Sequence, residues 1–406
     1  TRTIQVLQES GNLSAAIPLL ESSLESADPK TRPETIFTLA SIHFAIAQYT
    51  KASEYFSLYL SEYSKESLAP EASYRVGLSE FSQHNHERAI ASFEQTIANW
   101  PNATFVPDAS FRIASSLVAL KRFPEAIEKC DQWISQSKTS AFKPEFLSLK
   151  ADTLAALEQF PEAIEAYKES ITQNGGDQIT QYAILEIYRL FEKLNHPDQS
   201  SDYLKHFLTQ YPNHFAAPKA CLLLSKTLSK EGKHAEAKLL IASKLPDFLS
   251  DRSKEGVESL LSELVALCSG VISDKSQKEN SAPIDKVKLD DPLVLQTHLR
   301  ELNTHIPKPT QSSSPLSEAR LLFAESEFYR VHKDSEKSAS YLDQIIQKNT
   351  AETLSAPLLA ICGDRLAERK EVENAATFWF ELLKSFPRSE VAEYAYNGLG
   401  HIALSK

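Results

Sequence analysis

Residues 70–106 read PEASYRVGLSEFSQHNHERAIASFEQTIANWPNATFV, and this stretch decides the fold. Apolar side chains recur at helical spacing through its first half, and a second apolar run with the same spacing starts at Ala89. Pro70 is tolerated as a first helical residue, because the N–H that it lacks would have no partner there. Pro101 ends the second run, since proline cannot continue a helix. The stretch therefore predicts two amphipathic helices joined by a short turn.

This unit repeats every 37 residues along the chain. Two ladders of small residues keep the same period, at the seventh position after each starting proline and again twelve positions later. Self-similarity at such a period is typical of a solenoid of stacked helix pairs. The starting prolines are Pro33, Pro70, Pro107 and Pro144, with Pro218 two periods further on. The first ladder contains Ala40, Gly77, Ala114, Ala151, Gly363 and Gly400, and the second contains Ala52, Ala89, Ala126, Ala163 and Ala375.

The small residues have a packing reason. The two helices of a pair are expected to run antiparallel and to cross where the small residues lie, so a bulky side chain would push the helices apart. Overpacking of this kind costs about 1–3 kcal/mol per site. Aromatic residues late in the second helix are expected to fill the contact with the next repeat, and these are Tyr63, Trp100, Tyr211 and Phe386.

The pattern resembles the tetratricopeptide repeat, with Gly77 and Ala89 at its two small positions, Phe123 or Phe160 ahead of the second one, and a late proline. The resemblance covers nearly the whole chain. It implies an all-α fold, a right-handed superhelical solenoid of antiparallel helix pairs. The family's usual period is about 34 residues, whereas this chain keeps 37 and ends the second helix with an aromatic residue and proline. That longer form is similar to the repeats of bacterial cell-envelope proteins, such as the Tol-Pal coordinator and the outer-membrane assembly lipoprotein.

The repeat pattern also predicts how the chain divides. Residues 1–173 are expected to form a regular N-terminal solenoid, and repeats continue over residues 178–269 after a bend at Asn174-Gly175-Gly176-Asp177. Tyr188 stands where the next small residue should be. Either that helix is shifted by a residue or two, or this pair packs more openly.

The C-terminal part carries an insertion. Residues 270–290 are polar and lack apolar periodicity, which predicts an inserted loop. Residues 291–306 then supply the second helix that the interrupted pair lacks. The last part, residues 291–406, is expected to hold further repeats and to end on an unpaired first helix, whose apolar face requires a cap or a partner.

Composition excludes several function classes. The net charge is −11, from 43 Lys and Arg against 54 Asp and Glu, so no basic face is expected for nucleic acid. No apolar run reaches the length of a membrane-spanning helix. The four cysteines stand singly, without metal-binding spacing. We therefore expect neither a metal ion nor a cofactor.

The sequence contains no catalytic motif of the phosphate-loop, dinucleotide-binding, nucleophile-elbow or zinc-protease kinds. His84 and His86 lie in a turn between helices and are interpreted as solvated residues rather than ligands. We therefore expect that the chain is not an enzyme.

One ladder on the first helix of each pair is a candidate binding surface. In the resembled family this helix lines a concave groove that receives a peptide or a partner helix. Carried over, the groove offers acidic and aromatic residues with two arginines; the alternative is that the acids stabilise helix ends and the aromatics pack internally. The candidate partner-binding residues are Glu34, Phe37, Glu71, Tyr74, Arg75, Asp108, Phe111, Arg112 and Glu145.

Three functions compete. The first is a non-catalytic scaffold that binds partner proteins or peptides on a concave surface, in a bacterial cell envelope or periplasm; a cytoplasmic location is the alternative. The second is a substrate-recruiting or regulatory region of a larger enzyme, whose catalytic part lies outside these 406 residues. The third is a glycan-binding protein, whose surface aromatics stack on sugar rings.

Overall fold

The computed structural model of the chain describes residues 13–25, 28–136, 142–173, 177–254, 256–270, 292–308 and 313–405. Every regular element in these ranges is a helix, which confirms the predicted all-α fold. The chain divides into two compact units, unit 1 (residues 1–183) and unit 2 (residues 184–406). Their boundary lies within α11 (Asp177–Lys193).

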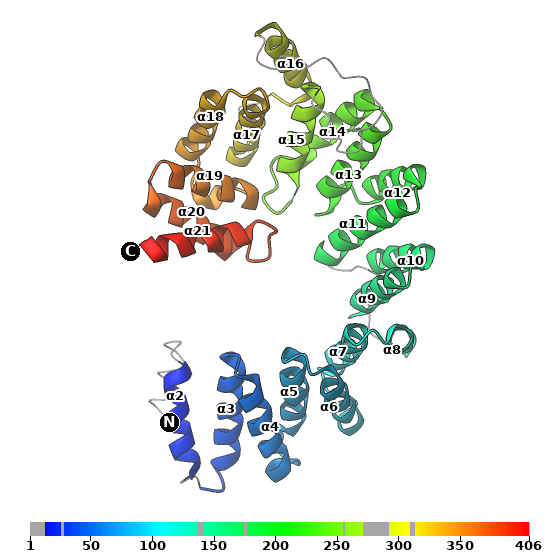
Figure 1. The fold of residues 1–406 in the computed structure, drawn as a ribbon, viewed down its shortest axis with the longest axis vertical. Coiled ribbons are helices and arrows are strands. Elements are labelled where there is room, and N and C mark those ends of the chain that lie inside the picture. The colour runs from blue at the N-terminus through cyan, green and yellow to red at the C-terminus, as the bar shows by residue number, and fades with distance from the viewer. Residues whose placement is uncertain are drawn as a thin grey trace. The chain divides into compact units, whose positions relative to one another are not determined.

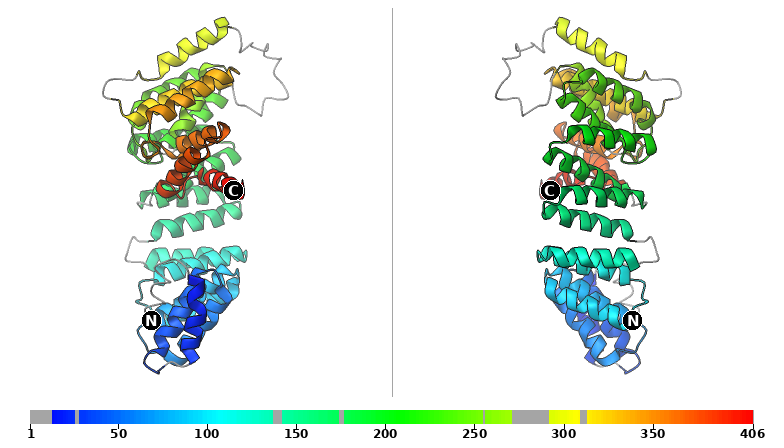
Figure 2. Two further views of the ribbon diagram at one scale, coloured as in Figure 1. Left: turned by 90° about the vertical axis from the view of Figure 1, so that its left-hand side faces the viewer. Right: turned by 90° about the vertical axis from the view of Figure 1, so that its right-hand side faces the viewer.

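In unit 1 the helices stack side by side in chain order (Figures 1 and 2). We call the first helix of each pair helix A and the second helix B. From α2 to α10, each helix A packs on its own helix B, and each helix B packs on the next helix A. The helices are α2 (Leu13–Glu25), α3 (Arg32–Ala45), α4 (Tyr49–Tyr63), α5 (Ala69–Ser82), α6 (His86–Asn99), α7 (Val106–Ala119), α8 (Phe123–Gln136), α9 (Lys143–Ala156) and α10 (Phe160–Thr172).

In unit 2 consecutive helices pack on each other from α12 to α16 and again from α17 to α21. After α11 its helices are α12 (Pro197–Gln210), α13 (Ala217–Lys230), α14 (His234–Phe248), α15 (Val257–Cys268), α16 (Pro292–His305), α17 (Pro315–Val331), α18 (Ser335–Lys348), α19 (Ala356–Glu368), α20 (Val372–Ser385) and α21 (Ala392–Ser405), with a short 3₁₀ helix η1 (Ala351–Thr353) before α19.

The turn from helix A to helix B has one repeated backbone conformation. One residue in each turn has a positive φ, for example 60° at Ala47 and 59° at Lys121. The next residue donates its N–H to the carbonyl five residues earlier, as Gln48 does to His43 at 2.8 Å. This is the Schellman arrangement, which satisfies carbonyl groups at a helix end. The positive-φ residues recur at the 37-residue period: Ala47, His84, Lys121, Glu158, Asn195 and Gly232, then Lys333 and Lys370.

Aromatic residues followed by proline end three of the B helices. Trp100, Tyr211 and Phe386 each leave the helical conformation, and each still donates its N–H to the carbonyl four residues earlier. The following proline explains the change, because proline excludes the preceding residue from helical backbone angles.

The ladders of small residues lie inside the stack. Every alanine of both ladders has no exposed surface, and Gly77 and Gly363 are buried. A Cβ atom on Gly77 would come within 2.5 Å of the Phe93 ring in α6. The glycine thus lets the aromatic ring of helix B reach the backbone of helix A.

One helix keeps the predicted register and another departs from it. In α11 the buried residues Ile184 and Phe191 lie 37 positions after Leu147 and Leu154, which are buried in α9, so α11 stays in register although the half-buried Tyr188 stands at its small-residue position. In α21, Gly400 is exposed and a Cβ atom on it would meet nothing within 4 Å, whereas a Cβ on Gly398 would come within 2.6 Å of Trp379. Gly400 therefore does not occupy the close-approach position predicted for it; Gly398 does.

The predicted insertion and bend lie largely outside the described residues, which omit 174–176 and 271–291. The helix predicted over 291–306 is α16, which contacts α15 and α14. α17 also packs directly on α15. The terminal helix α21 packs on α20 and α19.

Candidate functional site

The predicted binding ladder includes a polar link between two successive A helices of unit 1. The Tyr74 hydroxyl in α5 donates to Asp108 Oδ2 in α7, and Arg112 Nε donates to the same oxygen at 2.6 Å. Burial, together with the hydrogen bond to Asp108, raises the pKa of Tyr74 to about 12. Tyr74 therefore stays protonated at neutral pH and acts as a hydrogen-bond donor.

Both ladder arginines lie over aromatic rings of the preceding helix pair. The Arg75 guanidinium carbon is 5.9 Å from the Phe56 ring centre, and that of Arg112 is 5.2 Å from the Phe81 ring centre. Arg75 also pairs with Glu71, one helical turn away, at 2.7 Å. A cation within about 6 Å of a ring centre is attracted by the ring. Each arginine is thus held by a carboxylate of its own helix and a ring of the neighbouring repeat.

The ladder aromatics are half-buried and pack against other rings. Phe37 meets Phe56 edge-on at 5.4 Å between centres, and Phe111 meets Phe146 edge-on at 5.5 Å. Tyr74 stacks on Phe105, with the centres 4.7 Å apart and the planes 11° apart. A ring face that is stacked on protein cannot stack on a sugar, so these contacts weigh against the glycan-binding alternative.

The two outer acids of the ladder lie differently. Glu34 is exposed. Glu145 is half-buried, and its Oε2 atom is buried without a hydrogen-bond partner among the described residues. The structure thus brings together the two clusters around Arg75 and Arg112, and no hydrogen bond within the described part of the chain joins Glu34 or Glu145 to either cluster.

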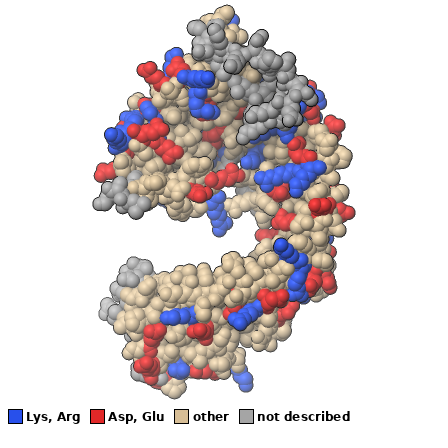
Figure 3. Space-filling view, in the orientation of Figure 1, with Lys and Arg blue, Asp and Glu red and all other residues tan. Residues whose placement is uncertain are grey.

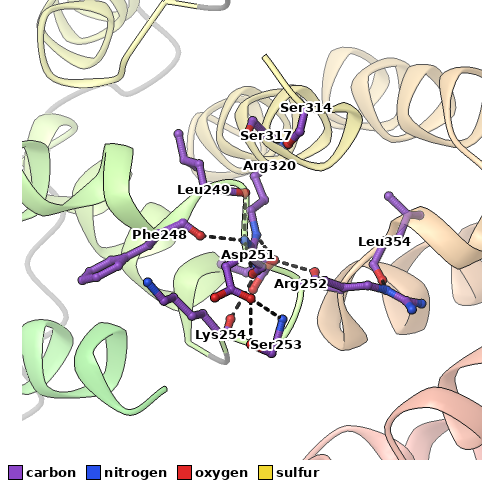
Figure 4. Close-up of polar contacts among 12 residues, drawn as sticks. Phe248, Leu249, Asp251, Arg252, Ser253, Lys254, Ser314, Ser317, Arg320 and Leu354 are labelled. Atoms are coloured by element: carbon purple, nitrogen blue, oxygen red, sulfur yellow. Dashed lines mark hydrogen bonds and ion pairs between the residues drawn. The ribbon is translucent and has the colours of Figure 1, made fainter. Parts of the chain in front are cut away.

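A buried polar cluster in unit 2 was not predicted from the sequence. Arg320 of α17 has no exposed surface, and its Nε donates to Glu258 Oε1 of α15 at 2.7 Å. Figure 4 shows its guanidinium facing the turn between α14 and α15. Its Nη atoms donate to four backbone carbonyl oxygens of that turn, at 2.9 to 3.3 Å: Phe248, Leu249, Asp251 and Lys254. The Ser355 hydroxyl, just before α19, also donates to Glu258 Oε1, at 2.6 Å.

Arg252, in the same turn, contacts the segment before α19 and the C-terminal end of α20. Its Nε donates to the carbonyl of Leu354 at 2.5 Å, and its Nη2 lies 3.3 Å from Glu381 Oε1 in α20 (Figure 4 shows the Leu354 end). Its guanidinium carbon is 4.7 Å from the Phe386 ring centre. The two arginines therefore fix one turn against α17, against the segment that precedes α19, and against α20. The cluster connects structural elements and contains no group poised for chemistry.

Cavities on the surface of the units include one of about 460 Å³ in unit 2, lined by residues of α16 and α17 that include Asn303 and Leu321. A cavity of about 810 Å³ in unit 1 is lined by α8, α9 and α10, with Leu147 and Leu154 among its apolar residues and Glu162 and Glu165 among its charged ones. A cavity of about 480 Å³ in unit 2 lies between α19, α20 and α21, against Trp379. Within the described ranges, no group of three or more potential metal ligands comes together.

The thiols and surface charges also bear on function. All four cysteines are buried, which raises the pKa of each thiol to about 12 and keeps it in its unreactive neutral form. Figure 3 shows acidic and basic residues interspersed on the face that it displays. No helix in the described part of the chain is long and apolar enough to cross a membrane.

Comparison with known proteins gives one family match. Residues 40–190 match the model of the tetratricopeptide repeat-like domain. No curated protein sequence matches the chain.

Three similar solved structures have low sequence identity to this chain. A chain of the Naa15/Naa10 complex bound to HypK-THB is 11% identical with a TM-score of 0.43, and the alignment covers 95% of this chain but only 58% of that one. A tetratricopeptide repeat protein from Parabacteroides merdae is 11% identical, with a TM-score of 0.36 and coverage of 78% and 93%. PilF of Pseudomonas aeruginosa is 18% identical, with a TM-score of 0.36 and coverage of 54% and 93%. The helix pairs of unit 1 and the family match confirm the predicted superfamily for this part of the chain: residues 40–190 form a tetratricopeptide repeat-like domain.

Proposed function

We propose that the chain is a non-catalytic scaffold that binds a protein or peptide partner along the A helices of unit 1. The observation that carries the proposal is the pair of clusters around Arg75 and Arg112. They present a cation, a carboxylate and aromatic rings at the same place on α5 and α7, one repeat apart. A repeated set of such groups suits an extended peptide or a helix that runs along several repeats.

The geometry of the two arginines supports this proposal. The side chains of Arg75 and Arg112 are about a third exposed, at 31% and 32%, so each keeps part of its surface available to a partner. Each is already held by a carboxylate and a ring. A side chain that is fixed before binding loses less conformational freedom when the partner arrives, which favours affinity.

Site-specific photo-crosslinking tests the proposal. A benzoylphenylalanine at position 34, replacing exposed Glu34 in helix A, is compared with one replacing exposed Glu94 in helix B of the next pair. We expect a defined set of crosslinked proteins from position 34 only, which Arg112→Glu weakens. Identical products from both positions, or products that Arg112→Glu leaves unchanged, would contradict binding on the A helices.

We also infer a bacterial cell-envelope location. The support is the 37-residue period and the aromatic-proline ends of the B helices, at Trp100, Tyr211 and Phe386. Fractionation of the source cells tests the inference, with recovery in the envelope or periplasmic fraction as the expected result. Recovery in the cytosolic fraction would overturn the location and leave the binding proposal standing.

A further inference from the structure

Helix α16 is held in unit 2 by few contacts. Among residues 293–305, only Leu302 is fully buried, and Leu293 is 72% exposed. Glu301 forms an ion pair with Lys238 of α14. His298 Nδ1 lies 3.1 Å from Nε2 of His332 in α17. The polar contacts of Glu301 and His298 thus add to the burial of Leu302 in holding α16 against α14, α15 and α17.

The histidine contact has a defined hydrogen-bond direction. His332 Nδ1 lies 2.8 Å from the carbonyl oxygen of Phe328, which can only accept, so Nδ1 carries the proton. In neutral His332 the Nε2 atom is then an acceptor, and His298 must donate to it from Nδ1. His332 is 2% exposed and its ring lies 4.2 Å from the Phe328 ring, so water cannot replace this partner.

Protonation changes the contact in two steps. One added proton leaves the hydrogen bond intact, because one of the two facing nitrogen atoms can still accept. A second proton gives both facing nitrogen atoms an N–H, so neither can accept and two positive charges face each other. A doubly protonated pair therefore repels, inside a site with little water.

Titratable groups near His298 and His332 influence how readily His298 binds a proton. Burial and the neighbouring His332 lower the pKa of His298, while Glu301 on the same helix raises it in part. Glu301 is engaged by Lys238 of α14. On α15 the nearby titratable group is Cys268, which burial keeps neutral. On α17, Glu327 and Arg330 pair with each other at 2.7 Å.

We propose that the His298–His332 contact is a pH-sensitive latch, which holds α16 on α14, α15 and α17 at neutral pH and releases it in mild acid. The direction follows from proton linkage. Docked His298 binds a proton less readily than it does in a released helix, so docking is fully favourable above the ordinary histidine pKa of about 6.5 and weakens as the pH falls below it. The latch is independent of what unit 1 binds.

Hydrogen exchange of the full chain, read by mass spectrometry at pH 7.5 and pH 5.0, tests the latch. After correction for intrinsic exchange rates, we expect protection of α16 to fall more than tenfold at pH 5.0, while protection of α18 stays constant. In His298→Asn the fall is expected to be less than threefold. The Asn amide can donate to neutral His332, or accept from protonated His332, and it never becomes charged.

Glu301→Gln is the matched control, because it removes the other polar contact of α16 without touching the histidines. It is expected to lower protection at both pH values and to keep a pH dependence at least as steep as in the wild type, since Glu301 opposes the lowering of the His298 pKa. The ratio of α16 protection at pH 7.5 to that at pH 5.0 is compared between variants that still protect α16 at pH 7.5. An equal fall in wild type and His298→Asn, or no fall in the wild type, overturns the latch.

Discussion

At the scale of single residues, glycines mark where an aromatic ring of helix B touches helix A. Gly77 faces Phe93, and Gly363 and Gly398 both face Trp379. The 37-residue period of the small residues predicts, from the sequence, that Gly77 and Gly363 lie where two helices approach closely. It could not predict Gly398, because α21 departs by two residues from the period and no later repeat shows the shift.

Gly77→Ala is expected to destabilise the chain by about 1–3 kcal/mol, because its Cβ would meet the Phe93 ring at 2.5 Å. Gly400→Ala is the control. Its Cβ meets nothing within 4 Å, so the better helix propensity of alanine should stabilise by up to about 1 kcal/mol. Urea unfolding followed by circular dichroism measures both changes. Equal midpoints for the two variants would contradict the close-approach explanation.

Tyr74 gives a prediction for alkaline pH. Its pKa in the folded chain is about 12, against an ordinary value of 10.0, so the folded state holds the phenolic proton more tightly. The resulting stabilisation is complete below pH 10 and is lost as the pH rises towards 12. We expect Tyr74→Phe to lose less stability than the wild type between pH 10 and pH 12, as measured by thermal melts. Parallel losses would exclude a raised pKa at this residue.

At the scale of elements, the sequence predicts the helix pairs well and their connections less well. A proline followed by a small residue seven positions later, repeated every 37 residues, indicates the A helices. The positive-φ turn residues share a backbone angle but no residue type, being alanine, histidine, lysine, glutamate, asparagine and glycine. Arg320 was missed because its partner Glu258 lies 62 residues earlier in the sequence, across the insertion. The only signal was its position one turn before Phe323 on the buried face of α17.

One substitution in the turn between α7 and α8 is expected to make the folded chain more stable. Lys121 is exposed with a φ of 59°, a conformation that costs a residue with a Cβ roughly 1 kcal/mol and costs glycine nothing. Lys121→Gly is therefore expected to raise stability by up to about 1 kcal/mol. Lys205→Gly, at an exposed position within α12, should instead lower it by about the same amount. Thermal melts of the two variants should shift in opposite directions, and a loss in both would contradict the turn's assigned role.

The buried arginine cluster predicts a large loss of stability. Arg320→Met removes the cation that pairs with Glu258, to which, among the described residues, only the Ser355 hydroxyl then donates, and it removes the donor to four backbone carbonyls of the α14–α15 turn. Breaking a buried ion pair from one side costs about 3–5 kcal/mol. Arg330→Ala on the same helix removes an exposed pair with Glu327 and should cost less than about 1 kcal/mol. Urea unfolding compares them; similar small losses would show that the cluster does not fix the turn.

At the scale of the whole molecule, the two compact units are expected to unfold in separate steps. Each helix contacts mainly its neighbours along the chain, so one unit can open while the other stays folded. Differential scanning calorimetry should show two transitions. Gly77→Ala should lower one of them, and Arg320→Met the other. A single transition that both substitutions shift equally would mean that the chain unfolds as one cooperative block.

Trp379 also limits how this chain could be recombined. Its ring lies against Gly363 of its own pair and against Gly398 of the helix that follows. If α19 and α20 were duplicated or transplanted together, the helix placed after them would need glycine at the position of Gly398, because a Cβ atom there would meet the Trp379 ring. Modules cut from this chain are therefore not freely interchangeable, and a consensus built by averaging the repeats would erase the match between tryptophan and glycine.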